Sequence, residues 1–257
     1  MTGDAGRRWL ELMGAQLVRC FQMSPRGHAS IDDGGWLALT GERLADLNMA
    51  CVFEGPRGPS LLARYARSAR EVDVPLIVVL EHADDELVDQ ARGLGAEDAG
   101  GIPIMVWSDG PAAAIVTSDD ARPVAATDEL ASVIALMAEA FSLDLTMCLS
   151  ALAPLYGVEG VTFWLCEREG EILGTGVGIR SGETVGVYSM ATPRRHQRQG
   201  VGRAVLSTLM ANYLADGVTE FYLGATPAGF RLYEQLGYRV VADPPAFVIG
   251  TSTQFHR

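Results

Sequence analysis

The segment from Tyr188 to Leu206 brings together residues whose types and spacing suit the binding of an anion. Gly200 and Gly202 come at the expected start of a helix that follows a strand and a turn. The first N–H groups of a helix have no partner inside it and carry a partial positive charge, so they form an anion site. Glycines at this point let phosphate oxygens approach the backbone. The alternative is that the glycines serve only tight packing of the strand against the helix.

Arginines favour the phosphate interpretation. Four of the nine arginines after Arg122 lie within residues 194–203, although this part of the chain carries 13 Asp and Glu residues. All 20 basic residues are arginine, which excludes a Schiff-base lysine, a Walker-type phosphate lysine and a lysine general base. The formal net charge of −12 argues against a nucleic-acid partner. The sequence therefore predicts an acidic protein with one local phosphate site.

Two motifs resemble a known superfamily. Residues 197–202 (Q-R-Q-G-V-G) resemble the Q/R-x-x-G-x-G/A pyrophosphate loop of the GNAT superfamily of acyl-CoA-dependent N-acyltransferases, and residues 190–192 are similar to its preceding strand end. Residues 225–238 resemble the second signature, a helix ending in L-Y-E-x-L-G-[FY]. The resemblance covers about residues 122–252, and it implies acetyl-CoA as acyl donor and no metal.

The resemblance also implies a role for each matching residue. Tyr233 corresponds to the tyrosine that protonates the departing CoA thiolate, with plain core packing as the alternative. Thr226 stands where many relatives have Asn, so it either contacts CoA or only caps the next helix. Main-chain groups at the strand end would meet the pantetheine arm and the thioester carbonyl, and these residues are Met190, Ala191 and Thr192. The expected pyrophosphate ligands are Gln197, Arg198, Gln199, Gly200, Val201, Gly202 and Arg203.

The general base is not identified by any motif. Glu183 and Glu167 lie on strands near the expected site, but they also fit the pattern of exposed hairpin charges. His196 lies beside the loop within a run of arginines and is expected to be a solvated turn residue. A water chain would serve equally well. The acceptor also stays open among cationic amines such as polyamines, aminoglycosides and peptide N-termini.

Alternating strands and helices predict an α/β fold with a mixed sheet, and a polar stretch at 118–123 marks a boundary between domains 1–120 and 121–257. Thr127 is the expected N-cap of the first helix of the second domain. The elements expected in this domain are helices at 127–141, 143–155, 200–215 and 227–236, with strands at 161–167, 172–179, 183–191, 219–225, 238–242 and 247–251. This ααβββαβαββ order is also that of the GNAT fold, in which the last two strands close the sheet.

The first domain is expected to be a degenerate GNAT-like copy or an accessory α/β domain. It shows no counterpart of the glycine loop after a strand, so only the second domain is expected to keep the CoA loop. Trp36, Asn48 and Trp107 are candidates to face an acceptor cleft, or are plain core. Its expected elements are helices at 8–21, 60–71 and 84–94, with strands at 36–39, 48–53, 76–80, 102–107 and 113–116.

These observations predict an N-acetyltransferase that transfers an acetyl group from acetyl-CoA to a primary amine by direct attack in a ternary complex. The main alternative is a non-catalytic acyl-CoA-binding sensor or regulatory module. A nucleotide-binding protein is disfavoured because the required lysine or Rossmann acid is missing. The four scattered cysteines predict neither a zinc site nor disulfides. No segment has the pattern of a signal peptide or a membrane span, so we expect a cytoplasmic monomer or homodimer with no nucleic-acid or membrane partner.

Overall fold

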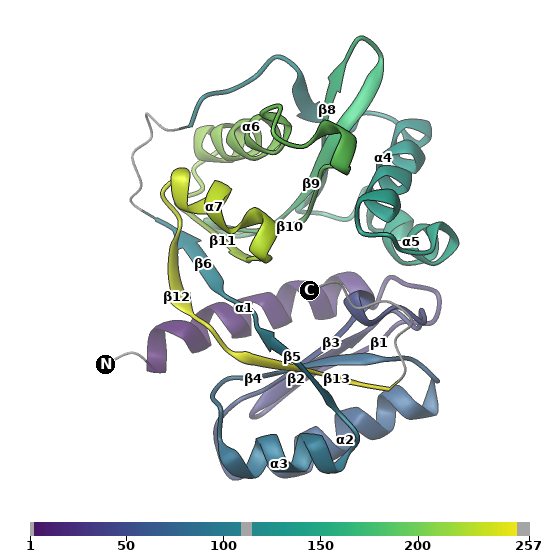
Figure 1. Cartoon of the computed structure of the whole chain (residues 1–257), viewed down its shortest axis with the longest axis vertical. Helices are drawn as coiled ribbons and strands as arrows, with labels where there is room; N and C mark the ends of the chain where they lie inside the picture. The colour runs from purple at the N-terminus through teal and green to yellow at the C-terminus, as the bar shows by residue number, and fades with distance from the viewer. Residues whose placement is uncertain (1–2, 109–114, 251–257) are drawn as a thin grey trace. The chain divides into compact units, whose positions relative to one another are not determined.

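The computed structural model of the chain describes residues 3–108 and 115–250 and contains two compact units. One unit comprises Met1–Ile104 together with Val241–Arg257, and the other comprises Met105–Val240. Each unit holds one mixed β-sheet with helices packed on it (Figure 1). Among the described residues, no helix is both long enough and apolar enough to cross a membrane.

The first unit is built on a six-stranded sheet with the order β1-β2-β3-β4-β13-β5. Its centre is β4, a run of five apolar residues that is buried throughout, as expected for a strand covered on both faces. The expected helices and most of the strands are found within a few residues of their predicted ends. Its elements are α1 (Gly3–Phe21), β1 (His28–Asp32), β2 (Gly35–Leu39), β3 (Asn48–Val52), α2 (Gly58–Glu71), β4 (Leu76–Leu80), α3 (Asp85–Gly93), β5 (Glu97–Gly101) and β13 (Pro245–Ile249).

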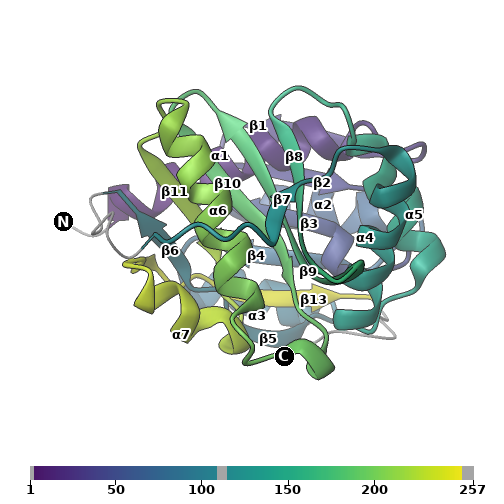
Figure 2. The same ribbon diagram turned by 90° about the horizontal axis from the view of Figure 1, so that it is seen from above.

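The second unit is built on a seven-stranded sheet with the order β12-β6-β11-β10-β9-β8-β7. Figure 2 shows α6 from the side, in front of the strands of this sheet, with α4 and α5 at one side of the view. The elements of this sheet and its helices are β6 (Ile104–Trp107), β7 (Ala121–Pro123), α4 (Thr127–Ala140), α5 (Leu145–Leu152), β8 (Val161–Arg168), β9 (Glu171–Ser181), β10 (Thr184–Ala191), α6 (Val201–Ala215), β11 (Glu220–Gly224), α7 (Pro227–Gln235) and β12 (Arg239–Ala242).

Two strands are exchanged between the sheets. β13 follows the second unit in sequence, yet it pairs antiparallel with β4 and β5 of the first (Figure 1). In the opposite direction, β6 follows the first unit and inserts between β11 and β12. The expectation that 247–251 closes the sheet of its own half is therefore wrong, and the compact units differ from the expected ranges 1–120 and 121–257.

Smaller differences concern helix ends. Helix α4 begins at Thr127 itself, so Ala126 is the N-cap and no side chain caps this end. The expected helix 143–155 is divided into α5, capped by the Asp144 carboxylate, and a 3-10 helix at Ala153–Leu155. Part of the strand expected at 113–116 lies outside the described residues, and residues 115–116 are not in a strand.

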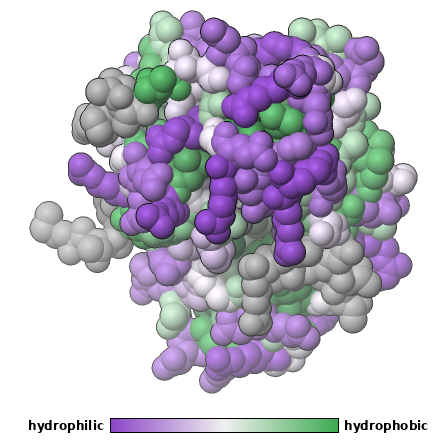
Figure 3. All heavy atoms as spheres, turned by 45° about the horizontal axis from the view of Figure 1, so that its top comes forward, coloured by the Kyte–Doolittle hydropathy of each residue, from purple (hydrophilic) through white to green (hydrophobic). Residues whose placement is uncertain are grey.

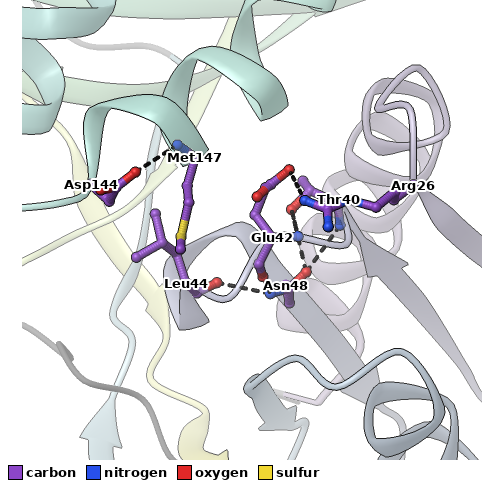
Figure 4. A network of polar contacts seen from close by, with 7 residues as sticks. All are labelled: Arg26, Thr40, Glu42, Leu44, Asn48, Asp144 and Met147. Carbon is purple, nitrogen blue, oxygen red and sulfur yellow. Dashed lines mark hydrogen bonds and ion pairs between the residues drawn. The ribbon is translucent and has the colours of Figure 1, made fainter.

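The residues considered for an acceptor cleft in the first half belong to the interior. The Trp36 indole N–H donates to the Leu10 carbonyl at 2.9 Å, and Trp107 packs edge-on against Phe221 in the core of the second unit. Asn48 is fully buried, and its amide closes the loop between β2 and β3 by donating to the Glu42 and Leu44 carbonyls (Figure 4). The polar side chains lie mainly on the surface, and the face drawn in Figure 3 is largely hydrophilic.

Candidate acyl-CoA site

The two central parallel strands of the second unit separate toward their carboxyl ends. β10 and β11 pair at only three positions, from Thr184–Glu220 to Gly186–Tyr222. Beyond them β10 continues to Ala191 without pairing with β11. Main-chain groups that would be satisfied in a closed sheet are therefore available to a ligand at this edge, the usual location of binding sites in open α/β sheets.

A β-bulge at the end of β10 widens this opening. Tyr188 pairs with Val177 and Ala191 pairs with Thr175, so β10 has one extra residue relative to β9. Ser189 adopts a φ of +49°, an uncommon conformation for a residue other than glycine. Bulges and strained residues of this kind are concentrated beside functional sites. The bulge leaves Ser189 and Met190 without a partner in β9, which frees the strand end expected to meet the thioester.

The start of α6 leaves several main-chain N–H groups without a partner in the described part of the chain. Gly200 is the N-cap in the left-handed region (φ +80°), and a Cβ there would meet no atom within 4 Å. Among the described residues, the main-chain N–H groups of residues 198–203 donate no hydrogen bond, and the helical pattern begins with Ala204 N–H to the Gly200 carbonyl. Several N–H groups therefore point out of an exposed turn at the positive end of a 15-residue helix.

The structure separates the four loop arginines by role. Arg195 forms an ion pair with Glu139 of α4, so its charge is already balanced. Arg203 donates to the neutral amide of Gln235 at 2.8 Å. Arg194 and Arg198 are exposed and make no ion pair with any described residue. Three positive charges thus remain unbalanced around the free N–H groups, and Arg194, which was not among the expected ligands, joins Arg198 and Arg203.

The other loop residues are brought together as expected but have distinct contacts. The Gln197 amide donates to the Thr192 carbonyl at 3.0 Å, and the Gln199 amide donates to the Arg195 carbonyl at 3.0 Å. Gly202 permits close packing, since a Cβ there would lie 3.2 Å from Leu232 of α7. Thr226 is the N-cap of α7 and its hydroxyl accepts from the Gly229 N–H, so this side chain is used as a cap.

Three glycines of β9 position the start of α6, and the sequence analysis missed them. Gly174, Gly176 and Gly178 alternate along the strand and therefore share one face, the face on which α6 packs. A Cβ at Gly174 would lie 2.4 Å from Val201 Cγ1, and one at Gly178 would lie 2.8 Å from the Tyr213 ring. The signal was present as G-x-G-x-G at the period of a strand.

Tyr233 lies on α7 with a buried ring. It packs against Tyr238, with ring centroids 6.0 Å apart, and against Gly229, where a Cβ would lie 2.8 Å from the hydroxyl. Burial raises the pKa of Tyr233 to about 12. The phenol therefore keeps its proton throughout the neutral range and suits a proton donor better than a base.

The acidic candidates for a general base lie away from the opening between the carboxyl ends of β10 and β11, which we call the open seam. Glu167 accepts from Arg122 at 2.7 Å, and Arg122 also binds Glu129, so the Arg122 guanidinium joins β7, β8 and α4. Glu183 is exposed and precedes Thr184, roughly 20 Å from Met190 at the strand rise of about 3.3 Å per residue. His196 was expected to be a solvated turn residue, but its side chain is only 12% exposed and its Nε2 lies 3.1 Å from the Glu171 carboxylate.

The first unit has a comparable strand-loop-helix segment, but it is closed. β3 and β4 pair along their whole length, and Glu81 N–H continues the pattern to the Val52 carbonyl. The buried Glu81 carboxylate then accepts from Arg7 and from the Glu54 N–H at 2.8 Å. Burial alone would raise the pKa of Glu81, but these bonds outweigh it and lower the pKa overall. An internal anion is therefore already bound at the end of this seam.

The loop of the first unit is also poor in donors. The sequence indicated no glycine loop here, yet Gly55 lies before α2 and Gly58 is its first residue. Gly58 N–H is bonded to the Gly55 carbonyl, Pro59 has no N–H, and Arg57 pairs with Asp33 at 3.2 Å. The anion site of α6 therefore has no equivalent at α2.

Comparisons with known proteins agree with this geometry. Residues 159–240 match the family model described as an acetyltransferase (GNAT) domain. A GCN5-related N-acetyltransferase from Kribbella flavida has a similar structure, with a TM-score of 0.68 and 18% identity over 98% of this chain and 97% of that one. A tandem GNAT protein from the clavulanic acid biosynthesis pathway has a TM-score of 0.54 and 13% identity over 95% and 94% of the two chains. No curated protein matches the chain.

Residues 159–240 therefore match a GNAT acetyltransferase domain. The predicted GNAT-like fold is confirmed, with structural similarity to a tandem relative extending across both units. The domain match supports an acyltransferase activity in general terms.

Proposed function

We propose that the protein is an acetyl-CoA-dependent N-acetyltransferase that acetylates a primary amine of a small molecule or peptide by direct attack in a ternary complex. The observation that carries this proposal is the open seam between β10 and β11 beside the unpaired N–H groups of α6. Arg194, Arg198 and Arg203 lie at the same helix end and supply charge for a pyrophosphate. Helix N-termini and arginines are the groups that bind phosphates best in proteins.

The residues of this site suit each step of the transfer. Bound acetyl-CoA supplies an acetyl thioester, whose carbonyl carbon forms a bond with the amine nitrogen while the bond to sulfur breaks. The free main-chain groups at Ser189–Met190 are suited to holding the carbonyl oxygen as negative charge develops on it. Tyr233 donates its proton to the departing sulfur, and the proton that the nitrogen loses passes through water and restores the phenol. The high pKa of Tyr233 keeps the donor protonated at neutral pH.

The first unit is proposed to bind no CoA and to act as a support. Its seam is filled by Glu81, and its helix end lacks free donors. We therefore expect one acetyl-CoA per chain. The proposal places the protein in the cytoplasm as a monomer or homodimer that binds neither nucleic acid nor a membrane, and the four free, buried cysteines suit a reducing compartment. No metal takes part in the proposed reaction, and among the described residues no cluster of three or more His, Cys, Asp and Glu side chains could hold one.

Calorimetry with acetyl-CoA tests the proposal directly. Gly200→Glu places a carboxylate at the proposed anion site. This variant should show none of the acetyl-CoA binding that the wild type shows. Gly170→Glu is the matched control, because Gly170 has the same φ of +80° and the same open surroundings but lies in the β8–β9 hairpin. Binding by Gly200→Glu at wild-type strength, or no binding by the wild type, would refute the proposed site.

The second candidate is an acyl-CoA-binding sensor that has lost turnover. It is favoured by the positions of the two carboxylates considered as bases, since Glu167 is paired with Arg122 and Glu183 precedes the far end of β10. A mass-spectrometric screen of amine acceptors with acetyl-CoA distinguishes the two functions. An acetylated amine supports the enzyme, whereas tight acetyl-CoA binding without CoA release across the panel supports the sensor.

A further inference from the structure

Four polar side chains form a network on the loop between β10 and α6. The Arg195 guanidinium forms an ion pair with Glu139 in the last turn of α4, and its Nε lies 3.9 Å from the carboxylate of Glu171, the first residue of β9. The His196 ring contacts the same Glu171 carboxylate at 3.1 Å. Carboxylates from two separate elements therefore hold two successive residues of the loop.

The network continues through the loop to the start of α6. The Gln199 amide donates to the Arg195 carbonyl at 3.0 Å, and Gln199 directly precedes Gly200, the N-cap of α6. Arg198 adopts a φ of +63°, an uncommon conformation that persists only when the surrounding contacts hold it. A displacement of Arg195 would therefore also move the residues that present the free N–H groups of the loop.

The charges of this network do not by themselves suit an anion site. It contains two carboxylates against one guanidinium, and an excess of negative charge opposes the binding of a nearby pyrophosphate. Arg194 and Arg198, on either side of Arg195 and His196, make no ion pair with any described residue. The loop thus contains arginines that are available to phosphates and one arginine that joins it to α4 and β9.

We propose that Arg195 is a positioning residue, held by Glu139 and Glu171, that keeps the loop in its pyrophosphate-binding conformation before acetyl-CoA arrives. This inference rests on the proposed function of the same site. A loop that is fixed in advance loses less conformational freedom on binding, so more of the interaction free energy contributes to affinity. Arg195 acts through the loop and does not itself touch the phosphates.

Neutral substitutions of the Arg195–Glu139 ion pair distinguish positioning from electrostatic attraction. Calorimetry measures the Kd for acetyl-CoA of full-length Arg195→Gln, Glu139→Gln and the double variant. If the charges acted only through their field, Glu139→Gln would bind more tightly and the double variant, whose net charge is unchanged, would match the wild type.

We expect instead that the Kd of the double variant rises about three- to five-fold, the effect of one well-formed exposed ion pair. Arg195→Lys keeps a cation beside Glu139 and should bind acetyl-CoA more tightly than Arg195→Gln does.

The matched control is a second exposed ion pair, Arg57–Asp33 of the first unit, whose charged atoms are 3.2 Å apart. The double variant Arg57→Gln, Asp33→Asn removes the same two charges far along the chain from the loop. It should lower the thermal unfolding temperature to a similar small degree and leave the Kd for acetyl-CoA unchanged. A raised Kd in the loop variant alone therefore separates positioning of the loop from a general loss of stability.

Each remaining outcome decides the matter. Wild-type affinity in the Arg195→Gln, Glu139→Gln variant overturns the positioning role and leaves the proposed function standing, and so does equal weakening in the control variant. If the double variant does not fold, Glu139→Gln decides alone, since weaker binding supports the role and unchanged or tighter binding overturns it. Failure of the wild type to bind acetyl-CoA refutes the proposed function itself.

Discussion

Adding one methyl group at Gly174 of β9 should weaken acetyl-CoA binding by displacing the start of α6, which packs on this strand. In Gly174→Ala the new Cβ would lie 2.4 Å from Val201 Cγ1, whereas carbon atoms pack at about 3.5–4.0 Å. Val201 is the first residue of α6, and a valine in a helix strongly prefers one rotamer, so rotation offers little relief. The start of α6 must therefore move by about 1 Å, together with the free N–H groups of the loop.

The size of the effect follows from these contacts. Overpacking of this kind costs about 1–3 kcal/mol of folding free energy. Displacing the loop should also lose one charge-assisted hydrogen bond to the pyrophosphate, worth about 1.5–3 kcal/mol, so the Kd for acetyl-CoA should rise roughly ten- to a hundred-fold. Thermal unfolding measures the first quantity and calorimetry measures the second.

Gly178→Ala is the matched control for this experiment. It lies on the same face of β9, and its Cβ would meet the Tyr213 ring at 2.8 Å, roughly 18 Å along α6 from Val201 at about 1.5 Å per residue. It should lower stability to a similar degree while leaving the Kd close to that of the wild type. A folded Gly174→Ala that binds acetyl-CoA normally, or equal weakening in both variants, would refute the positioning role of the glycines.

Three further predictions concern the proton donor, the closed seam and the exchanged strand. Tyr233→Phe keeps the ring packing and should lower kcat for CoA release by roughly 10²–10⁴-fold with an unchanged acetyl-CoA Kd, and an unchanged kcat would exclude Tyr233 as the acid. The depressed pKa of Glu81 stabilises the fold above the usual carboxyl pKa of about 4.3, and this stabilisation is lost as the pH falls through the lowered value. Glu81→Gln should therefore reduce the loss of unfolding free energy, measured with urea, as the pH is lowered. An equal loss in the variant and the wild type would contradict this. A chain ended after Asp243 lacks β13, so hydrogen exchange of the β4 amides should become much faster, and wild-type protection would show that β13 is dispensable.

The sequence predicted most elements, including the helix start after the glycine turn, because local chemistry specifies them. The run Leu76–Leu80 is apolar enough to be a strand in any context, and glycines before α6 indicate a helix start wherever they occur. β5 was missed because its residues, E-D-A-G-G, are poor strand formers that pair only after β13 is in place. The local sequence of β13 does not indicate which of the two sheets this strand joins.

Roles within the site were harder to predict than its location. The sequence shows four arginines near one turn, but whether each charge is balanced depends on distant residues, such as Glu139 for Arg195. The sequence did not predict the hydrogen bond between the Tyr188 and Tyr222 hydroxyls either, because these residues are 34 positions apart and meet only through strand pairing.

The exchange of β6 and β13 means that the first sheet can be completed only after the second unit has been synthesised at the ribosome. When the first sheet has emerged, β4 still has an unpaired edge with a fully apolar strand, and β5 has no partner at all. The free edge of β4 and the strand β5 gain their partner, β13, only after the whole second unit has been translated, since β13 follows this unit in the sequence. Unpaired apolar edges promote aggregation, so the nascent chain depends on chaperones or on rapid folding of the second unit during this interval. For the same reason neither half can be moved to another protein as a self-sufficient module.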